Sequence, residues 1–130
     1  TGVLVATTNR TRDLDEAFFR RFDDFVVLPI PDRPTRQRLW SVFLKAEHGP
    51  DLDLEFIGGQ FAISGGLIRS AAIRADAWRS GLDIEMDTSL VLASLARELE
   101  KNDRSSVEAM VPPYRERVLE LLEGPLEDAP

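Results

Sequence analysis

Three prolines within six residues divide this chain into two parts of different character. They stand in the connector Pro29-Ile30-Pro31-Asp32-Arg33-Pro34, where each proline fixes its own φ and restricts the residue before it. Before the connector, residues 2–6 and 25–28 are uninterrupted apolar runs. After it, apolar residues recur at helical spacing. The layout predicts the end of an α/β domain, followed across a stiff connector by a separate helical domain.

The part before the connector is expected to contribute two strands to a parallel sheet. Residues 2–8 and 24–28 read as buried strands because their apolar runs are continuous rather than alternating. A short helix is predicted over 15–21, with acidic residues in its first turn and Arg20 and Arg21 in its last. That order of charges suits the helix dipole.

The part after the connector is expected to be a helical bundle, so the whole chain is predicted to be predominantly α. Proposed boundaries are 1–30 for the α/β part, 31–104 for the helical domain, and 105–130 for a last helix and flexible tail. Ser105 and Glu108 have the spacing of a capping box. Helices are predicted from 34 to about 47, from Ser64 as N-cap to 81, from 87 or 88 through 99, and from 113 to 123. The apolar residues between 52 and 61 suggest a further short helix, closed by the glycine pair 58–59 or shortly after it.

Composition excludes several classes of function. The chain has no cysteine and one histidine, His48, so disulfides, thiolate metal sites and His-rich metal sites are not expected. It contains no signal peptide and no apolar run of membrane-spanning length, which favours a cytoplasmic protein without a membrane partner. The net charge of −7 comes from an acidic excess after residue 46, which argues against a nucleic-acid partner there.

Asn9 follows the first apolar run and is a candidate catalytic residue. Ligands of open α/β sheets bind beyond the carboxyl ends of the strands, where Asn9 is predicted to lie. An amide can donate to a phosphate oxygen and accept from a water molecule. The alternative is that Asn9 caps a turn, which is the commoner role of such an asparagine taken alone.

Two further groups are candidates for phosphate recognition, and each has a plainer alternative. Arg20 and Arg21 could reach a nucleotide, or they could be surface charges favoured by the helix dipole. Gly65 and Gly66 could let the backbone at a helix start approach an anion, or they could serve a close crossing of two helices. Arg69 lies one turn further along the same helix.

The joint spacing of these groups resembles the AAA+ ATPases. The run ending in Asn9 is similar to the sensor-1 strand, and residues 14–23 (Leu-Asp-Glu-Ala-Phe-Phe-Arg-Arg-Phe-Asp) are similar to the arginine-finger segment. The resemblance implies that one arginine reaches the nucleotide of a neighbouring subunit. Many members place Pro-Gly between two arginines, whereas Arg20 and Arg21 are adjacent. The position of Arg21 before Phe-Asp favours it slightly as the finger.

The resemblance extends into the helical part. Pro31-Asp32 is similar to the crossover into the family's lid domain, and residues 64–72 are similar to the sensor-2 region at the start of a lid helix. Gly65 and Gly66 would then contact the nucleotide. Because Gly66 stands where some members carry a sensor-2 arginine, Arg69 is expected to be a weak phosphate ligand.

Two catalytic motifs of the family are missing from this sequence. It has no G-x-x-x-x-G-K-[ST] and no apolar strand ending in Asp-Glu, so it is expected to be the C-terminal portion of an ATPase and not competent alone. The resemblance implies ATP with Mg²⁺ in the full-length protein, no tight binding by this chain, and neighbouring subunits in a homo-oligomeric ring, expected to be a hexamer. The protein substrate is unknown. The alternatives are a non-enzymatic helical protein-interaction module and a nucleotide-responsive regulatory domain without turnover.

Overall fold

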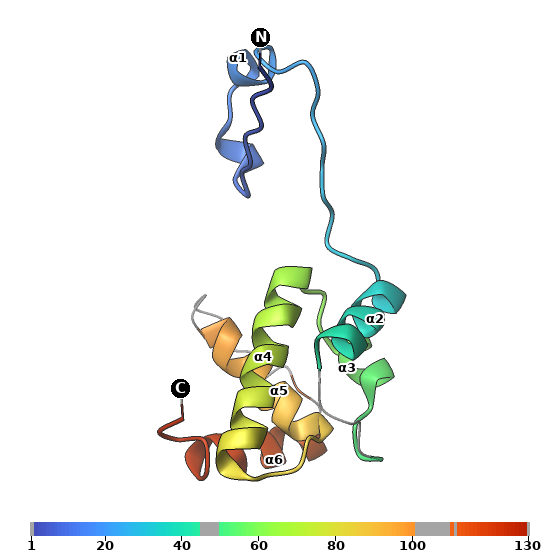
Figure 1. Cartoon of the computed structure of the whole chain (residues 1–130), viewed down its shortest axis with the longest axis vertical. Coiled ribbons are helices and arrows are strands. Elements are labelled where there is room, and N and C mark those ends of the chain that lie inside the picture. Colours follow the sequence, from blue (N-terminus) through green and yellow to red (C-terminus); the bar gives the residue numbers. More distant parts are fainter. Residues whose placement is uncertain (1, 45–49, 101–109, 111, 130) are drawn as a thin grey trace.

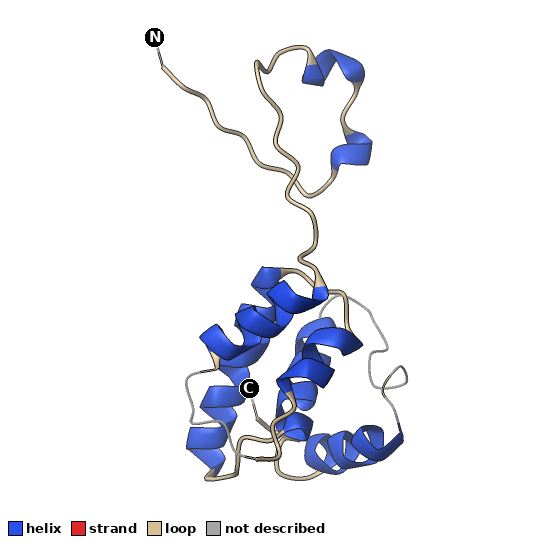
Figure 2. Ribbon diagram, turned by 90° about the vertical axis from the view of Figure 1, so that its right-hand side faces the viewer, coloured by secondary structure: helices blue, strands red, loops and turns tan. Residues whose placement is uncertain are grey.

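A computed structural model of the chain describes residues 2–44, 50–100, 110 and 112–129. These residues form helices and loops, with no strand among them (Figures 1 and 2). The elements in chain order are η1 (Thr11–Asp13), α1 (Glu16–Phe19), α2 (Arg33–Phe43), α3 (Leu54–Gln60), α4 (Gly65–Leu82), α5 (Thr88–Glu100) and α6 (Pro112–Glu123).

The predominantly helical character is confirmed, but the predicted end of a parallel sheet does not appear. Residues 2–8 and 24–28 are extended without a strand partner, and Val3 is 93% exposed. A strand requires a neighbour to satisfy its backbone N–H and C=O groups, and these two segments do not form a ladder with each other. The apolar runs thus lack both the hydrogen bonds and the burial that a strand would give them.

Acidic or hydroxyl side chains mark where most of the helices begin. Asp15, Asp32, Asp53 and Asp87 accept a backbone N–H three residues on, at 2.8, 2.9, 2.9 and 2.7 Å respectively. Ser64 accepts the Leu67 N–H at 3.3 Å, as an N-cap of α4 should. The predicted starts of the helices at Ser64 and at Asp87 are therefore confirmed.

The helix over 15–21 is shorter than predicted. It ends at Phe19, so Arg20 caps its C-terminus and Arg21 follows the helix instead of lying in its last turn. Ring contacts then hold the loop. The ring centre of Phe18 lies 5.0 Å from that of Phe22, and the ring centre of Phe19 lies 5.0 Å from that of Phe25. We call residues 2–30 the N-terminal segment; none of its side chains is buried.

The described residues from 33 to 129, here called the helical part, hold the core. α4 packs against both α5 and α2, α3 packs against α2, and α6 packs against α5 (Figure 1). Ala71, Ala72 and Ala75 form a fully buried stripe on α4, and small side chains allow the close approach of another helix. α5 is the central element because Arg97 and Glu100 are its only residues that are not buried.

The C-terminal end belongs to this core. Leu126 is fully buried, its N–H donates to the Leu121 carbonyl at 2.8 Å, and its carbonyl accepts from Arg97 Nη2 at 3.0 Å. The expectation of a frayed tail is therefore wrong at Leu126, because this leucine packs beneath α6. The predicted capping box at Ser105 and Glu108 lies outside the described residues.

Candidate functional site

A cavity of about 690 Å³ lies between the N-terminal segment and the start of α4. The turn of the N-terminal segment that contains η1 points toward this end of α4 (Figure 1). We call this cavity the junction cavity. Its walls come from three stretches of chain: residues 6–9 with Thr11; residues 25–28 with Ile30; and residues 62–64 with Leu67.

The lining of the junction cavity combines apolar side chains with neutral polar ones. Val26, Leu28, Ile30, Ile63 and Leu67 contribute the large aliphatic surface. The lining contains no charged residue. Its polar members carry hydroxyl or amide groups and are Thr7, Thr8, Asn9, Thr11 and Ser64. A ligand here would be held by apolar contact and by hydrogen bonds to neutral groups.

Asn9 is exposed and lines the junction cavity, where its amide makes no hydrogen bond to the rest of the described chain. The turn that follows is instead held by Thr8, whose Oγ1 accepts the Arg10 N–H at 3.0 Å. The alternative role for Asn9, a turn cap, is thus filled by its neighbour. The Asn9 amide stays available to a ligand.

The two candidate finger arginines lie away from the junction cavity. Arg20 Nη2 is 3.5 Å from Glu16 Oε2, and both side chains are highly exposed. Arg21 is exposed and forms no ion pair within the described part of the chain. Asp24, which could have paired with either arginine, accepts the Phe25 N–H at 2.8 Å.

The glycines at the start of α4 are not required by packing. A Cβ on Gly66 would meet only Ser64 Oγ, at 3.9 Å, and a Cβ on Gly65 would touch the flexible end of Leu39 at 3.4 Å. A close helix crossing therefore does not explain the pair. Neither glycine lines the junction cavity.

At this helix start, the residues that line the junction cavity are Ser64, which is the N-cap of α4, and Leu67 in its first turn. Nucleotide contact by Gly65 and Gly66 stays a prediction. Arg69 is exposed, does not line the cavity, and makes no ion pair with any described residue. The signal that could have found Ser64 was its N-cap role. An N-cap residue stands beside the free N–H groups of the first turn.

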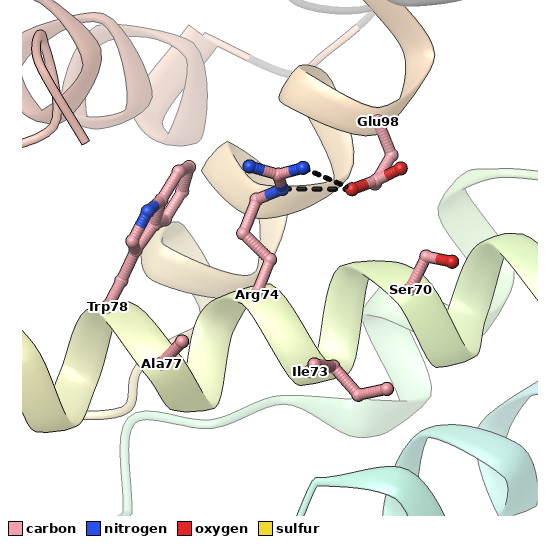
Figure 3. A pocket seen from close by; sticks show the side chains of 6 residues that line it. All are labelled: Ser70, Ile73, Arg74, Ala77, Trp78 and Glu98. Carbon is pink, nitrogen blue, oxygen red and sulfur yellow. Dashed lines mark hydrogen bonds and ion pairs between the residues drawn. The ribbon is translucent and has the colours of Figure 1, made fainter. Parts of the chain in front are cut away.

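A second pocket, of about 340 Å³, lies further along α4 and is lined by none of the predicted site residues. Arg74 donates from Nε and Nη2 to Glu98 Oε1 at 2.9 and 2.6 Å, and its guanidinium lies 5.6 Å from the Trp78 ring centre (Figure 3). Both members of the ion pair are largely buried. Because these charges satisfy each other, the pair joins α4 to α5 and offers little to a ligand.

The described residues hold no group of three or more His, Cys, Asp or Glu side chains that could bind a metal ion. The pKa of the Asp32 carboxyl is lowered by hydrogen bonds from the side chain and backbone of Thr35. Asp32 caps α2 and does not line the junction cavity. The cavity therefore contains no evident general acid or base of its own.

Comparisons with known proteins found two kinds of relative. The "ATP-dependent zinc metalloprotease FtsH" of Acidimicrobium ferrooxidans is 38% identical over 92 residues, which are 65% of this chain and 14% of that protein. FtsH of Nitrosococcus oceani is 32% identical over 99 residues, or 74% of this chain and 16% of that protein. Spastin of Drosophila grimshawi is 32% identical over 110 residues, or 81% of this chain and 14% of that protein.

The chain thus spans between 14% and 16% of the length of these curated relatives. No family model matches it, and no solved structure matches it. Among the described residues, no helix is both long enough and apolar enough to cross a bilayer. FtsH and Spastin are both AAA+ ATPases, and their similarity to most of this sequence identifies the chain as a relative of the AAA+ ATPases.

Proposed function

We propose that this chain contributes sensor 1, a trans-acting arginine finger and a nucleotide-contacting lid to the ATP site of an oligomeric AAA+ ATPase. The junction cavity is the observation that carries the proposal. It brings Asn9, from before the connector, and the N-terminal end of α4, from beyond it, to one volume of about 690 Å³. Volumes of this order are typical of small-molecule sites.

The lining fits one part of the proposed ligand and not another. Aliphatic side chains such as Ile63 and Leu67 suit a purine, and the hydroxyl and amide groups suit its ribose and a phosphate oxygen. The cavity lining includes no carboxylate to hold Mg²⁺ and no lysine to hold the β- and γ-phosphates. The metal and most of the phosphate contacts would therefore have to come from other residues.

In the proposed mechanism, Asn9 acts at the phosphate end of the nucleotide. Its amide N–H would donate to a γ-phosphate oxygen while its carbonyl oxygen accepts from the attacking water. Arg21, or Arg20 beside it, would reach the nucleotide of the next subunit. A guanidinium supplied in trans neutralises charge on the transferring group and contributes about 10³ to 10⁵ in rate.

The exposure of the arginines supports a trans role over a cis role. Arg21 has no partner among the described residues and lies outside the junction cavity, as a group used by a neighbouring subunit should. In this proposal residues 1–30 end an α/β core, 31–104 form the lid, and 105–130 add a last helix and a tail. A homo-oligomeric ring, most simply a hexamer, would bring the finger of one subunit to the site of the next and remodel a protein or complex.

The second candidate is a non-enzymatic helical interaction module. It is favoured by the fact that the helical part has its own core, whereas no side chain of the N-terminal segment is buried. Under that reading, the segment before the connector would be an accessory without a nucleotide.

A titration of the isotope-labelled chain with ATP and with AMP separates these readings. We expect weak binding, with amide shifts at Ser64 and Leu67 for both ligands and none at Arg21. Asn9 should shift with ATP and not with AMP, because AMP has no γ-phosphate. Asn9→Ala should abolish the difference between ATP and AMP at Ser64 while leaving AMP binding unchanged. Thr11→Ala, in the same cavity lining, is the matched control. If millimolar ATP causes no shift, the interaction module is favoured. If the chain binds ATP with micromolar affinity and hydrolyses it, the proposal that other residues supply the metal and most phosphate contacts is wrong.

The finger is tested in the natural protein at its full length. Arg21→Ala should reduce ATP hydrolysis by about 10³-fold or more while ATP binding is retained. Arg12→Ala, another exposed arginine of the N-terminal segment, is the control. If hydrolysis survives in both Arg21→Ala and Arg20→Ala, the finger assignment is wrong.

A further inference from the structure

Arg36 is a buried arginine that joins the connector to two helices. It lies in the first turn of α2 and is only 8% exposed. Its Nη1 donates to the Pro31 carbonyl at 2.6 Å, and its Nε donates to the Gly58 carbonyl at 2.9 Å. One guanidinium therefore links the connector, α2 and α3.

The contact with α3 has a clear physical basis. Gly58 is in the last turn of α3, where backbone carbonyls have no partner within the helix and the dipole favours a cation. A Cβ on Gly58 would lie 3.0 Å from the backbone nitrogen of Gln37, so a side chain there would force α2 and α3 apart. Glycine thus lets the helices approach until Arg36 reaches the carbonyl.

The contact with the connector fixes its second half. Pro31 has no N–H, so its carbonyl is its only backbone group able to form a hydrogen bond, and Arg36 binds it. Asp32 follows at once and caps α2 through the Thr35 N–H. From Pro31 onward the connector is therefore attached to the helical part, and the bend between the two parts is left to residues 27–29.

We propose that Arg36 is a positioning residue that sets where the connector bends. By holding Pro31, it keeps Ile30 with the helical part and confines motion between the two parts to residues 27–29. Val27 and Leu28 line the junction cavity, so a bend there changes the shape of that cavity directly. We also infer that binding of nucleotide in the cavity changes the environment of α2 through this bend, and this inference rests on the proposed function.

Backbone relaxation of the labelled chain tests the anchor without any nucleotide. Ile30 lies between two prolines, so its amide is the single probe at this point of the connector. In the natural chain we expect an order parameter near the rigid value of about 0.85 at Ile30 and a lower one at Val27. In Arg36→Gln, Ile30 should fall below about 0.6. Arg36→Lys, which can reach one carbonyl but not both, should fall between the two.

A purely structural role for Arg36 predicts a different result. If Arg36 only joined α2 to α3, the amides of Gln37 and Gly58 would change and Ile30 would keep its order. Arg38→Gln, an exposed arginine on the same helix, is the matched control and should alter none of these amides. If Arg36→Gln fails to fold, the order parameters of the natural chain still test the proposal. An Ile30 amide as mobile as that of Val27 would show that Arg36 does not hold the connector.

A second arm separates the failure of this proposal from failure of the nucleotide site. With ATP added, Asn9 and Ile30 should shift in the natural chain, together with Gln37 on α2. In Arg36→Lys the shift at Asn9 should persist and the shift at Gln37 should disappear. If ATP shifts nothing, the proposed function fails while the relaxation result stands; if Gln37 shifts equally in both chains, the coupling is wrong.

Discussion

The N-terminal segment and the helical part differ in what holds them together. In the segment no side chain is buried, and its contacts are local turns and phenylalanine rings in tilted or edge-to-face contact. In the helical part, α5 is buried along nearly its whole length and a charged pair is enclosed between two helices. The segment that resembles the arginine-finger region thus lies in the part with no core, and the segment that resembles the sensor-2 region lies in the part that has one.

The largest expected difference between the two parts is in the free energy of unfolding lost when a leucine is shortened to alanine. Leu95 is fully buried, so Leu95→Ala should lower the free energy of unfolding by about 2–5 kcal/mol. Leu28→Ala, the same change at a side chain that is 88% exposed, should alter it by less than about 0.5 kcal/mol. Urea unfolding followed by tryptophan fluorescence measures both. Similar losses in the two variants would mean that residues 2–30 share the core.

The next comparison sets two ion pairs of the same type against each other. Arg74 and Glu98 are 15% and 10% exposed, and Arg74→Met should cost about 3 kcal/mol because it leaves a buried carboxylate without its arginine. Arg20 and Glu16 are 80% and 92% exposed, and Arg20→Met should have no measurable effect on unfolding. Thermal unfolding by circular dichroism compares the variants. An equal shift of the midpoint in both would break the contrast.

A smaller effect concerns the exposed apolar runs of the segment. Extended apolar chain with free backbone groups pairs readily with another copy, so we expect dimers at high concentration. Val26→Lys should raise the dimer dissociation constant about tenfold, equivalent to about 1.4 kcal/mol. Val42→Lys, at an exposed valine of α2, is the control and should leave it unchanged. A clean monomer by light scattering in the natural chain would contradict the expectation.

The smallest effect depends on pH and concerns the boundary between the two parts. The Thr35 hydrogen bonds hold the pKa of the Asp32 carboxyl below the ordinary value of 3.8, so folding stabilises its ionised form. That stabilisation is complete above pH 3.8 and is lost as the pH falls through the lower pKa of the folded state. Carbon-13 titration of the Asp32 carboxyl should report the lowered midpoint. Asp32→Asn should keep the helix cap and remove this part of the pH dependence of stability. A titration midpoint at the ordinary value of 3.8 in the natural chain would contradict the prediction that the Thr35 hydrogen bonds lower the Asp32 pKa.

The helical part was largely predictable because its signals are local. Ser64 as a cap depends on neighbours within a few residues, and the structure confirms it. The strands were not predictable in the same way, because a strand exists only when another strand satisfies its backbone groups. An apolar run such as residues 2–6 indicates a tendency to pair and does not identify the partner.

The candidate site was predictable to the level of the element. The sequence pointed to Asn9 and to the start of α4, and both border the junction cavity. It could not distinguish Ser64 from Gly65 or Gly66 as the lining residue, because one position along a helix turns a side chain by a large angle. The link from Arg36 to Gly58 also escaped prediction, since the two are 22 residues apart and only packing brings them together.

The burial of Leu126 has a practical consequence for anyone shortening this chain. A cut after Gly124 looks harmless on paper, because a glycine and a proline meet there beyond the last helix. Such a cut would discard a side chain that fills space beneath α6 and the carbonyl that receives Arg97. Aggregation of such a shortened chain would then reflect a packing defect at its trimmed end.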